Sequence, residues 1–353
     1  MIDVVLGFIP FVLLIGIVVT VHELGHFLTA KHFGVFCGEF SIGMGPLLYK
    51  KQVGETQYSL RLLPVGGFVS MAGEADDTKV DASIPFERTI NGIKPARRIM
   101  VMMAGIVMNV LLALVLYIGV NLAIGEKIDT SKPADAIVAN IVVDGAADQA
   151  GMKIGDEFVS MKLAGGSTKA INDTEDINIV NDQLITFEVL REGKIQEIEM
   201  TPIFDEGSEK YLMGVSFSYP TIPMGPLESI QKGFQDMGRA SMLLMDALGR
   251  IFSGQDLDQL SGPVGIYQVA ADAIDYGVLY FCQLLALFSI NLAVMNALPL
   301  PVLDGGRALI VLLETIFKRK FNEKIMTGLL YGGVILLIAL MAYATFNDIL
   351  KMF

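Results

Sequence analysis

Two histidines and a glutamate lie within five residues of one another in the segment TVHELGHFL, residues 20–28. Helical residues four apart share a face, with Cβ atoms about 6 Å apart, so His22 and His26 can both reach one Zn²⁺ at about 2 Å. Glu23 lies beside the first histidine, where it can act as a general base but cannot join both histidines on the metal. The segment therefore predicts two zinc ligands and a catalytic base.

The alternative for these three residues is a polar contact between packed helices. From Val4 to Val19 the chain has no ionisable side chain, as in a segment built for lipid. Ionisable groups in such a segment are costly and usually functional, and each of the three would need its own partner. We therefore favour the metal site.

A catalytic zinc site needs a third protein ligand and one open position. Pro299 and Pro301, in the stretch NALPLPVLDGGRALI, cannot continue a regular helix, so the backbone should unwind there. Asp304 follows this break while still flanked by apolar residues. It can cap the next helix, ligate zinc, or do both. We favour zinc ligation because an intramembrane carboxylate otherwise lacks an evident partner.

Three further polar residues in this part of the chain are less decisive. Glu314 is a competing carboxylate, but it lies close to Lys318 in the sequence, so surface pairing explains it. Asn291 and Asn296 can hold a substrate's extended backbone or stabilise an oxyanion. They can equally form hydrogen bonds between helices, and both interpretations stay open.

The composition places these residues in a membrane protein. The 353 residues are 53% hydrophobic, with a mean hydropathy of +0.55, which is too apolar for an ordinary soluble domain. Four stretches reach the roughly 20 apolar residues that a hydrocarbon core requires. Only three residues precede the first span, so no cleavable signal peptide is expected. The predicted spans are residues 4–24, 99–124, 278–298 and 325–346.

Lysine and arginine set the expected orientation. Residues 31–98 contain nine of them and residues 318–324 contain four, so both loops should be cytoplasmic. Residues 125–277 contain 11 basic and 25 acidic residues and should lie outside, with both termini. This acidity suits solubility, and no nucleic-acid partner is expected. Cys37 and Cys282 have no partner on the oxidising side, so no disulfide is expected.

The loops contain further structure. The inner-loop runs FGVFCGEFSIGMGPLLYKK and TQYSLRLLPVGGFVSMAGE are typical of small hairpins. They either re-enter the membrane, where protein or a watery cavity must satisfy the backbone, or form a surface sheet, and we favour re-entry. Residues 127–217 alternate like a compact α/β domain, with a hairpin turn at Glu192-Gly193. Residues 225–254 form an amphipathic helix that lies on the membrane or, more simply, packs on that domain.

The expected fold is an α-helical polytopic membrane protein with four transmembrane helices and re-entrant β-hairpins, plus one extracytoplasmic α/β domain. Its expected parts are residues 1–125, with the first two spans and the inner loop; 126–218, the outer domain; 219–277, the amphipathic segment; and 278–353, the last two spans.

These motifs resemble the site-2 protease family of intramembrane zinc metalloproteases, and most closely the bacterial branch typified by the regulator-of-sigma-E protease. The likeness covers most of the chain. In the second span the family often reads G-P-x-x-N, whereas this chain has GIVMN at residues 105–109. The segments that carry the resemblance are HELGH, FSIGMGP, RLLPVGGFVSMAGE, a PDZ-like outer domain, SGPVGI and NALPLPVLDGG.

The resemblance implies His22, His26 and Asp304 as zinc ligands and Glu23 as the catalytic base. It also implies Asn291 and Asn296 as substrate-side residues, and inner-loop hairpins that meet substrate by strand addition. The expected location is the bacterial inner membrane, with the termini and the PDZ-like domain outside. The expected partners are the lipid bilayer and single-span membrane proteins, such as anti-sigma factors or remnant signal peptides.

We therefore predict a membrane-embedded zinc endopeptidase. A metal transporter could use the same three ligands, but it would not need Glu23, an outer domain or inner-loop strands. An inactive scaffold would not need a complete ligand set. The outer domain either filters substrates by size or captures a new C-terminus, and the sequence leaves both roles open.

Overall fold

The computed structural model describes residues 2–74, 83–129, 131–142, 145–162, 168–177, 179, 181–205, 210–255 and 261–351. The chain divides into two compact units, each described below by itself. The first unit combines Met1–Ile124 with Pro226–Phe353, and the second is Gly125–Gly225.

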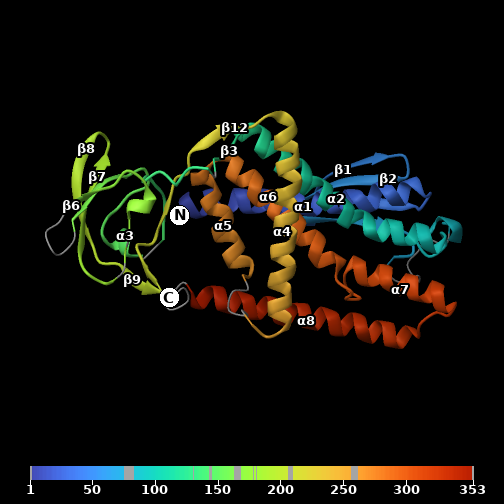
Figure 1. Ribbon diagram of the computed structural model, residues 1–353. Coiled ribbons are helices and arrows are strands. Elements are labelled where there is room, and N and C mark those ends of the chain that lie inside the picture. Colours follow the sequence, from blue (N-terminus) through green and yellow to red (C-terminus); the bar gives the residue numbers. More distant parts are fainter. Residues whose placement is uncertain are drawn as a thin grey trace. The chain divides into compact units, whose positions relative to one another are not determined.

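Among the described residues, four helices of the first unit are long and apolar enough to cross a membrane, which confirms the prediction of a multi-pass membrane protein. The first helix packs on the second, and the second packs on the third (Figure 1). The first helix continues past its expected end to His32, so the HELGH motif lies entirely within it. The four are α1 (Ile2–His32), α2 (Pro95–Ile124), α6 (Val278–Ala297) and α8 (Glu323–Leu350).

The third span ends where the two prolines predict a break. α6 ends at Ala297, and α7 (Asp304–Phe317) begins after an irregular connection. Gly305 and Gly306 allow the first turn of α7 to pack on this connection, because added Cβ atoms would come within 2.4 Å of the Ala297 carbonyl oxygen and 2.0 Å of the Leu300 carbonyl oxygen. The start of α7 is therefore fixed against the end of α6.

The inner loop forms one sheet of two long strands, β1 (Cys37–Val53) and β2 (Thr56–Met71). The expectation of separate small hairpins in each run was wrong. The glycines bend the strands instead of ending them, since Gly43 and Gly45 have φ values of +84° and +80°. An added Cβ at Gly43 would meet the Leu63 carbonyl oxygen at 2.7 Å, so the two strands cross closely at this bend.

The bends give one segment of the inner sheet two neighbours. Residues 39–42 pair with residues 57–60 and also with residues 67–70. Residues 67–70 pair with β1 alone among the described strands, so their other side is a free edge. Residues 58–60, by contrast, pair with residues 40–42 on one side and 49–51 on the other, so they are interior to the sheet.

Charged side chains attach the turn of this sheet to its surroundings. The Glu55 carboxylate accepts hydrogen bonds from Lys31, near the end of α1, and from Arg88 in the short helix η2 (Phe86–Arg88), both at 2.7 Å. These two bonds, the one from Lys31 first, hold the pKa of Glu55 below its usual range.

The amphipathic helix expected after the outer domain is α4 (Pro226–Phe252). It packs against α2 and α6 and crosses them steeply in Figure 1. Nδ2 of Asn121 on α2 donates a hydrogen bond to Asp236 on α4 at 2.9 Å. Packing on helices of the first unit therefore accounts for part of its apolar face.

The helix α5 (Pro263–Tyr276) begins inside the SGPVGI segment and is capped by another helix. The backbone N–H groups of Gly262 and Gly265 both donate to the buried Asp348 carboxylate of α8, each at 2.8 Å. The Asp348 carboxylate therefore takes the place of a local capping side chain and connects α8 to α5.

The second unit is built around an antiparallel sheet in the order β6-β5-β7-β8. Phe158 and Phe187 pack edge to face in its core, with ring centroids 5.0 Å apart. The expected hairpin turn at Glu192-Gly193 joins β7 to β8, and both residues have positive φ. The elements are β3 (Glu126–Ile128), β4 (Val138–Ile141), α3 (Ala146–Gln149), β5 (Glu157–Lys162), β6 (Thr168–Ala170), η3 (Thr174–Asp176), β7 (Ile185–Arg191), β8 (Lys194–Met200), β9 (Ile203–Asp205), β10 (Lys210–Leu212), β11 (Val215–Phe217) and β12 (Thr221–Pro223).

Candidate metal centre

The helices α1 and α2 approach closely at the HELGH motif because each has a glycine that faces the other helix. An added Cβ at Gly25 would come within 2.4 Å of the Ala104 carbonyl oxygen. An added Cβ at Gly105 would lie 2.5 Å from Nε2 of His26 and 2.6 Å from Cε1 of His22. Both histidines are buried, with 6% and 7% of their surface exposed. They therefore lie in a packed helix interface.

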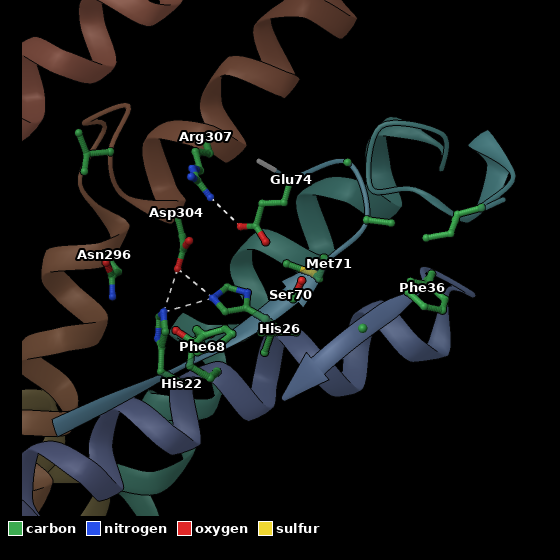
Figure 2. A pocket seen from close by; sticks show the side chains of 17 residues that line it. His22, His26, Phe36, Phe68, Ser70, Met71, Glu74, Asn296, Asp304 and Arg307 are labelled. Carbon is green, nitrogen blue, oxygen red and sulfur yellow. Dashed lines mark hydrogen bonds and ion pairs between the residues drawn. The ribbon is translucent and has the colours of Figure 1, made fainter. Parts of the chain in front are cut away.

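Three potential ligand atoms converge on one point (Figure 2). Nε2 of His22 and Nε2 of His26 are 3.2 Å apart. Oδ2 of Asp304 lies 3.0 Å from the first nitrogen and 3.2 Å from the second. The structure thus brings together three residues that are separated by up to 282 positions in the chain.

A backbone carbonyl orients the His26 ring. Its Nδ1 lies 2.8 Å from the Val101 carbonyl oxygen on α2. A carbonyl can only accept, so Nδ1 must carry the proton and donate it. In the neutral imidazole Nε2 then holds a lone pair directed at the other two ligand atoms.

Asn109 on α2 can orient the His22 ring in the same way. Its side chain is fully buried, Nδ2 lies 3.4 Å from Nδ1 of His22, and Oδ1 has no hydrogen-bond partner among the described residues. With the amide in the other of its two orientations, Oδ1 accepts the proton of Nδ1 and is satisfied. The His22 Nε2 lone pair then also points to the cluster. The backbone carbonyl of Asn109 accepts a hydrogen bond from Oγ of Ser289 on α6, at 2.8 Å.

The third ligand atom is an unsatisfied acceptor. Oδ2 of Asp304 is buried, and its contacts with the imidazoles do not have hydrogen-bond geometry, so it has no hydrogen-bond partner in the described part of the chain. A buried carboxylate oxygen left in this state is costly. Because the two facing nitrogens present lone pairs, a cation among the three atoms would remove this cost.

The size of the triangle fits zinc. Ligand atoms about 2.0–2.1 Å from a tetrahedral zinc lie about 3.3 Å from one another. The three separations here, 3.0, 3.2 and 3.2 Å, are close to that length. Two neutral imidazoles and one carboxylate, with an open fourth position, form a donor set of the catalytic type.

A cavity of about 710 Å³ opens onto the three side chains. Its lining includes Glu23, the β2 edge from Phe68 to Met71, and Asn296 at the end of α6 (Figure 2). Gly67 lies beside Glu23, since an added Cβ would be 3.8 Å from its Cγ. Asn291 is not among the described lining residues. The cavity thus has room for a peptide segment between the candidate base and a free strand edge.

Sequence reasoning compared residues 105–109 with a family pattern but gave Gly105 and Asn109 no role in supporting the candidate ligands. Gly105 and Asn109 are four residues apart and share the face of α2 that meets α1. An asparagine inside an apolar span is a usable signal, because it needs a partner there. The role of the Val101 carbonyl could not be recognised from the sequence, because every residue has a backbone carbonyl.

Comparisons with known proteins point the same way. Residues 10–340 match the model of peptidase family M50. A protein of Clostridium perfringens named "Putative zinc metalloprotease" is 35% identical over 94% of this chain and 95% of its own length. One of Fusobacterium nucleatum with the same description is 35% identical over 98% of this chain and 99% of its own. The protein "Zinc metalloprotease RasP" of Geobacillus kaustophilus is 29% identical over the full length of both chains.

Proposed function

The chain belongs to peptidase family M50 and is a zinc metalloprotease of the membrane, and from this premise we propose that it cleaves single-span membrane proteins within the bilayer. The observation that carries the proposal is the cluster of His22, His26 and Asp304, which shares a cavity with Glu23 among membrane-spanning helices. The substrates we propose are of the anti-sigma factor or remnant signal peptide type.

In this proposal His22, His26 and Asp304 hold the zinc. The Val101 carbonyl and the Asn109 side chain fix the two rings so that both Nε2 lone pairs face the metal. When bound, zinc polarises the scissile carbonyl and activates water for attack. Gly105 keeps α2 close enough to α1 for this arrangement to form.

Glu23 is the proposed general base. Its place one residue after the first ligand puts the carboxylate in the cavity without making it a ligand. It takes the proton of the attacking water and passes it to the leaving amine. Asn296 lines the same cavity and is the better placed of the two asparagines to hold the substrate, so Asn291 has the weaker support of the pair.

The free β2 edge is the proposed binding site for the unwound substrate. A transmembrane helix resists cleavage because its carbonyls are held in hydrogen bonds within the helix. Residues 67–70 present unpaired backbone groups beside Glu23 and can hold an extended segment by strand addition. Exposed apolar side chains on the same sheet, among them Leu47, Leu48 and Leu63, support the re-entrant placement of this sheet.

The orientation and the outer domain remain part of the proposal. The basic inner loop argues for the zinc site on the cytoplasmic side of the bacterial inner membrane, with the acidic residues 126–218 and both termini outside. We propose a PDZ-like domain for residues 126–218, which either filters substrates by size or captures a new C-terminus. Deleting residues 127–217 separates these roles: cleavage of previously uncut full-length substrate supports a filter, and loss of all cleavage supports capture.

The Glu23→Gln variant tests the function. Purified wild-type protein and this variant are compared for zinc content and for cleavage of a membrane-embedded peptide. We expect full zinc content and a cleavage rate about 10²–10⁴-fold lower, the usual contribution of a general base. Unchanged cleavage would remove Glu23 from its role. Loss of zinc would instead make Glu23 a ligand.

A further inference from the structure

An ion pair next to the metal centre has no role in the mechanism described so far. Nη1 of Arg307 lies 2.9 Å from Oε1 of Glu74 (Figure 2). Arg307 is on α7, the helix that begins with Asp304, and Glu74 follows the end of β2. The pair therefore joins the helix of the third candidate ligand to the strand with the free edge.

The backbone on the Glu74 side is held in place. Gly73 has a φ of +78°, which turns the chain after β2, and its carbonyl accepts a hydrogen bond from Nδ2 of Asn91 at 2.6 Å. The N–H of Ala72 donates to the Phe36 carbonyl at 2.9 Å. Glu74 thus extends from a fixed turn, so a displacement of its carboxylate would also displace the strand edge.

The Arg307 side is equally fixed. Arg307 lies one turn after Asp304, on the same face of α7. Its backbone N–H donates to the Leu303 carbonyl at 3.0 Å. The first turn of α7 cannot rotate freely, because Gly305 and Gly306 pack directly on the end of the α6 connection. The backbone of Arg307 therefore has a defined position relative to Asp304.

The pair lies where two cavities meet. Besides the cavity that contains Glu23, a second one of about 780 Å³ is lined by residues of α2, α7 and α8. Glu74 and Arg307 line both, as do His26 and Asp304. The ion pair therefore spans the gap between the strand edge and α7, beside the cavity where the proposed function places a peptide.

We propose that the Glu74–Arg307 ion pair is a positioning element of the protease, which holds the free edge of β2 at a set distance from the helix that carries Asp304. This inference rests on the proposed function. Both side chains are about one third exposed, so the pair contributes little to global stability. Its effect is on geometry, where a displacement of about 1 Å at a reacting group can cost about 10²-fold in rate.

A double-mutant cycle tests the proposal. Glu74→Gln, Arg307→Gln and the combined variant are compared with wild type for kcat and KM on a membrane-embedded peptide, for zinc content, and for amide hydrogen exchange of residues 66–73. We expect each single variant to lower kcat about tenfold with zinc content unchanged. The combined variant should be no worse than either, because both changes break one interaction. Exchange at the strand edge should be several-fold faster in all three.

Conservative and distant variants provide the controls. Arg307→Lys keeps the charge and should recover most of the activity lost in Arg307→Gln. Lys232→Gln breaks the Lys232–Asp236 pair on α4, whose lysine side chain is 37% exposed against 38% for Arg307, and which lies outside both cavity linings. It should leave kcat and strand-edge exchange unchanged.

Several results would overturn the proposal. Losses that multiply in the combined variant would mean that the two side chains act separately, and a loss confined to Arg307→Gln would point to direct substrate contact by Arg307. Unchanged exchange at residues 66–73, or lost zinc, would also exclude a strand-positioning role. The Glu23→Gln variant in the same assay distinguishes failure of this inference from failure of the proposed function, because only the latter changes the Glu23 result.

Discussion

Two aspartates, one in each unit, differ in how their carboxylate oxygens are compensated by hydrogen bonds. Asp156 in the second unit is 0% exposed and fully paired: Nε and Nη2 of Arg191 donate to its two oxygens at 2.7 and 2.6 Å, and the N–H of Lys153 donates at 2.8 Å. Oδ2 of Asp304 in the first unit is buried with no hydrogen-bond donor among the described residues.

The difference distinguishes a structural carboxylate from a proposed metal ligand. Asp156 receives all its compensation from its own unit, so it stabilises the fold and is unavailable to anything else. The two imidazoles that face Asp304 have their Nδ1 atoms turned away, toward the Val101 carbonyl and the Asn109 side chain. No described residue donates a hydrogen bond to Oδ2 of Asp304, and this favours its proposed role as a metal ligand.

The largest expected effect is on zinc. Asp304→Asn should reduce the zinc content of the purified protein to background and cleavage to the level of Glu23→Gln or below. In zinc-free buffer its thermal unfolding temperature should be at or above that of the wild type, because the variant removes a carboxylate charge whose Oδ2 no described residue compensates with a hydrogen bond. Metal analysis and unfolding scans on the same samples check both parts. Full zinc occupancy in this variant would contradict the assignment of Asp304.

The opposite behaviour is expected at Asp156. Asp156→Ala leaves the Arg191 guanidinium, whose side chain is 18% exposed, without its buried partner, a change that typically costs about 3–5 kcal/mol. The second unit should become sensitive to proteolysis while zinc content stays at the wild-type level. Limited proteolysis followed by mass spectrometry localises the cuts. Intact residues 125–225 together with lost zinc would contradict the structural role assigned to Asp156.

Acid should destabilise the second unit by protonating the Asp156 carboxylate. Burial raises the pKa of Asp156, but the hydrogen bonds from Arg191 and the Lys153 N–H outweigh it and hold the pKa below its usual range. A lowered folded-state pKa contributes stability that is present above the unfolded value of about 3.9 and is lost as pH falls through the folded value. Unfolding of wild type and Asp156→Asn should therefore differ most at neutral pH and converge in acid.

A steric change at the metal centre should have a smaller effect than loss of a ligand. An alanine Cβ at position 105 would meet both imidazoles at 2.5–2.6 Å, so Gly105→Ala must displace them or separate α1 from α2. A shift of this size predicts a loss of about 10²-fold in cleavage, with weaker zinc binding. Gly119→Ala on the same helix is the matched control, because nothing lies within 4 Å of its added Cβ. It should leave activity unchanged and stabilise slightly.

Much of the candidate metal centre could be predicted from sequence because its signals are local. The spacing of His22 and His26 fixes their common helix face, and two prolines before Asp304 fix the end of α6. Span length and apolar composition were enough for the four long helices. In the second unit the sequence also predicted the Glu192-Gly193 turn correctly.

The parts that sequence could not give depend on contacts between distant segments. The inner sheet was misjudged because Gly43 and Gly45 are as compatible with a bend as with a strand end, and the pairing of residues 39–42 on both sides decides between them. The Arg307–Glu74 pair spans 233 positions, and charge alone offers many partners at that separation. Nothing in the residue types indicated it.

The smallest expected effect is at Asn109, and it tests how the chain orients a ligand. Asn109→Ala removes the group that faces Nδ1 of His22, so the ring loses its fixed tautomer while all three ligands remain. Loss of such a supporting bond typically costs about 10–100-fold in metal affinity, and we expect the lower end, because the ring stays packed against Gly105. Competition with a zinc chelator measures it. Asn121→Ala is the matched control: it lies on the same helix and is also buried, but it binds Asp236 of α4. Equal zinc affinity in the two variants would show that His22 needs no partner beyond the metal, and that Oδ1 of Asn109 does not orient the His22 ring.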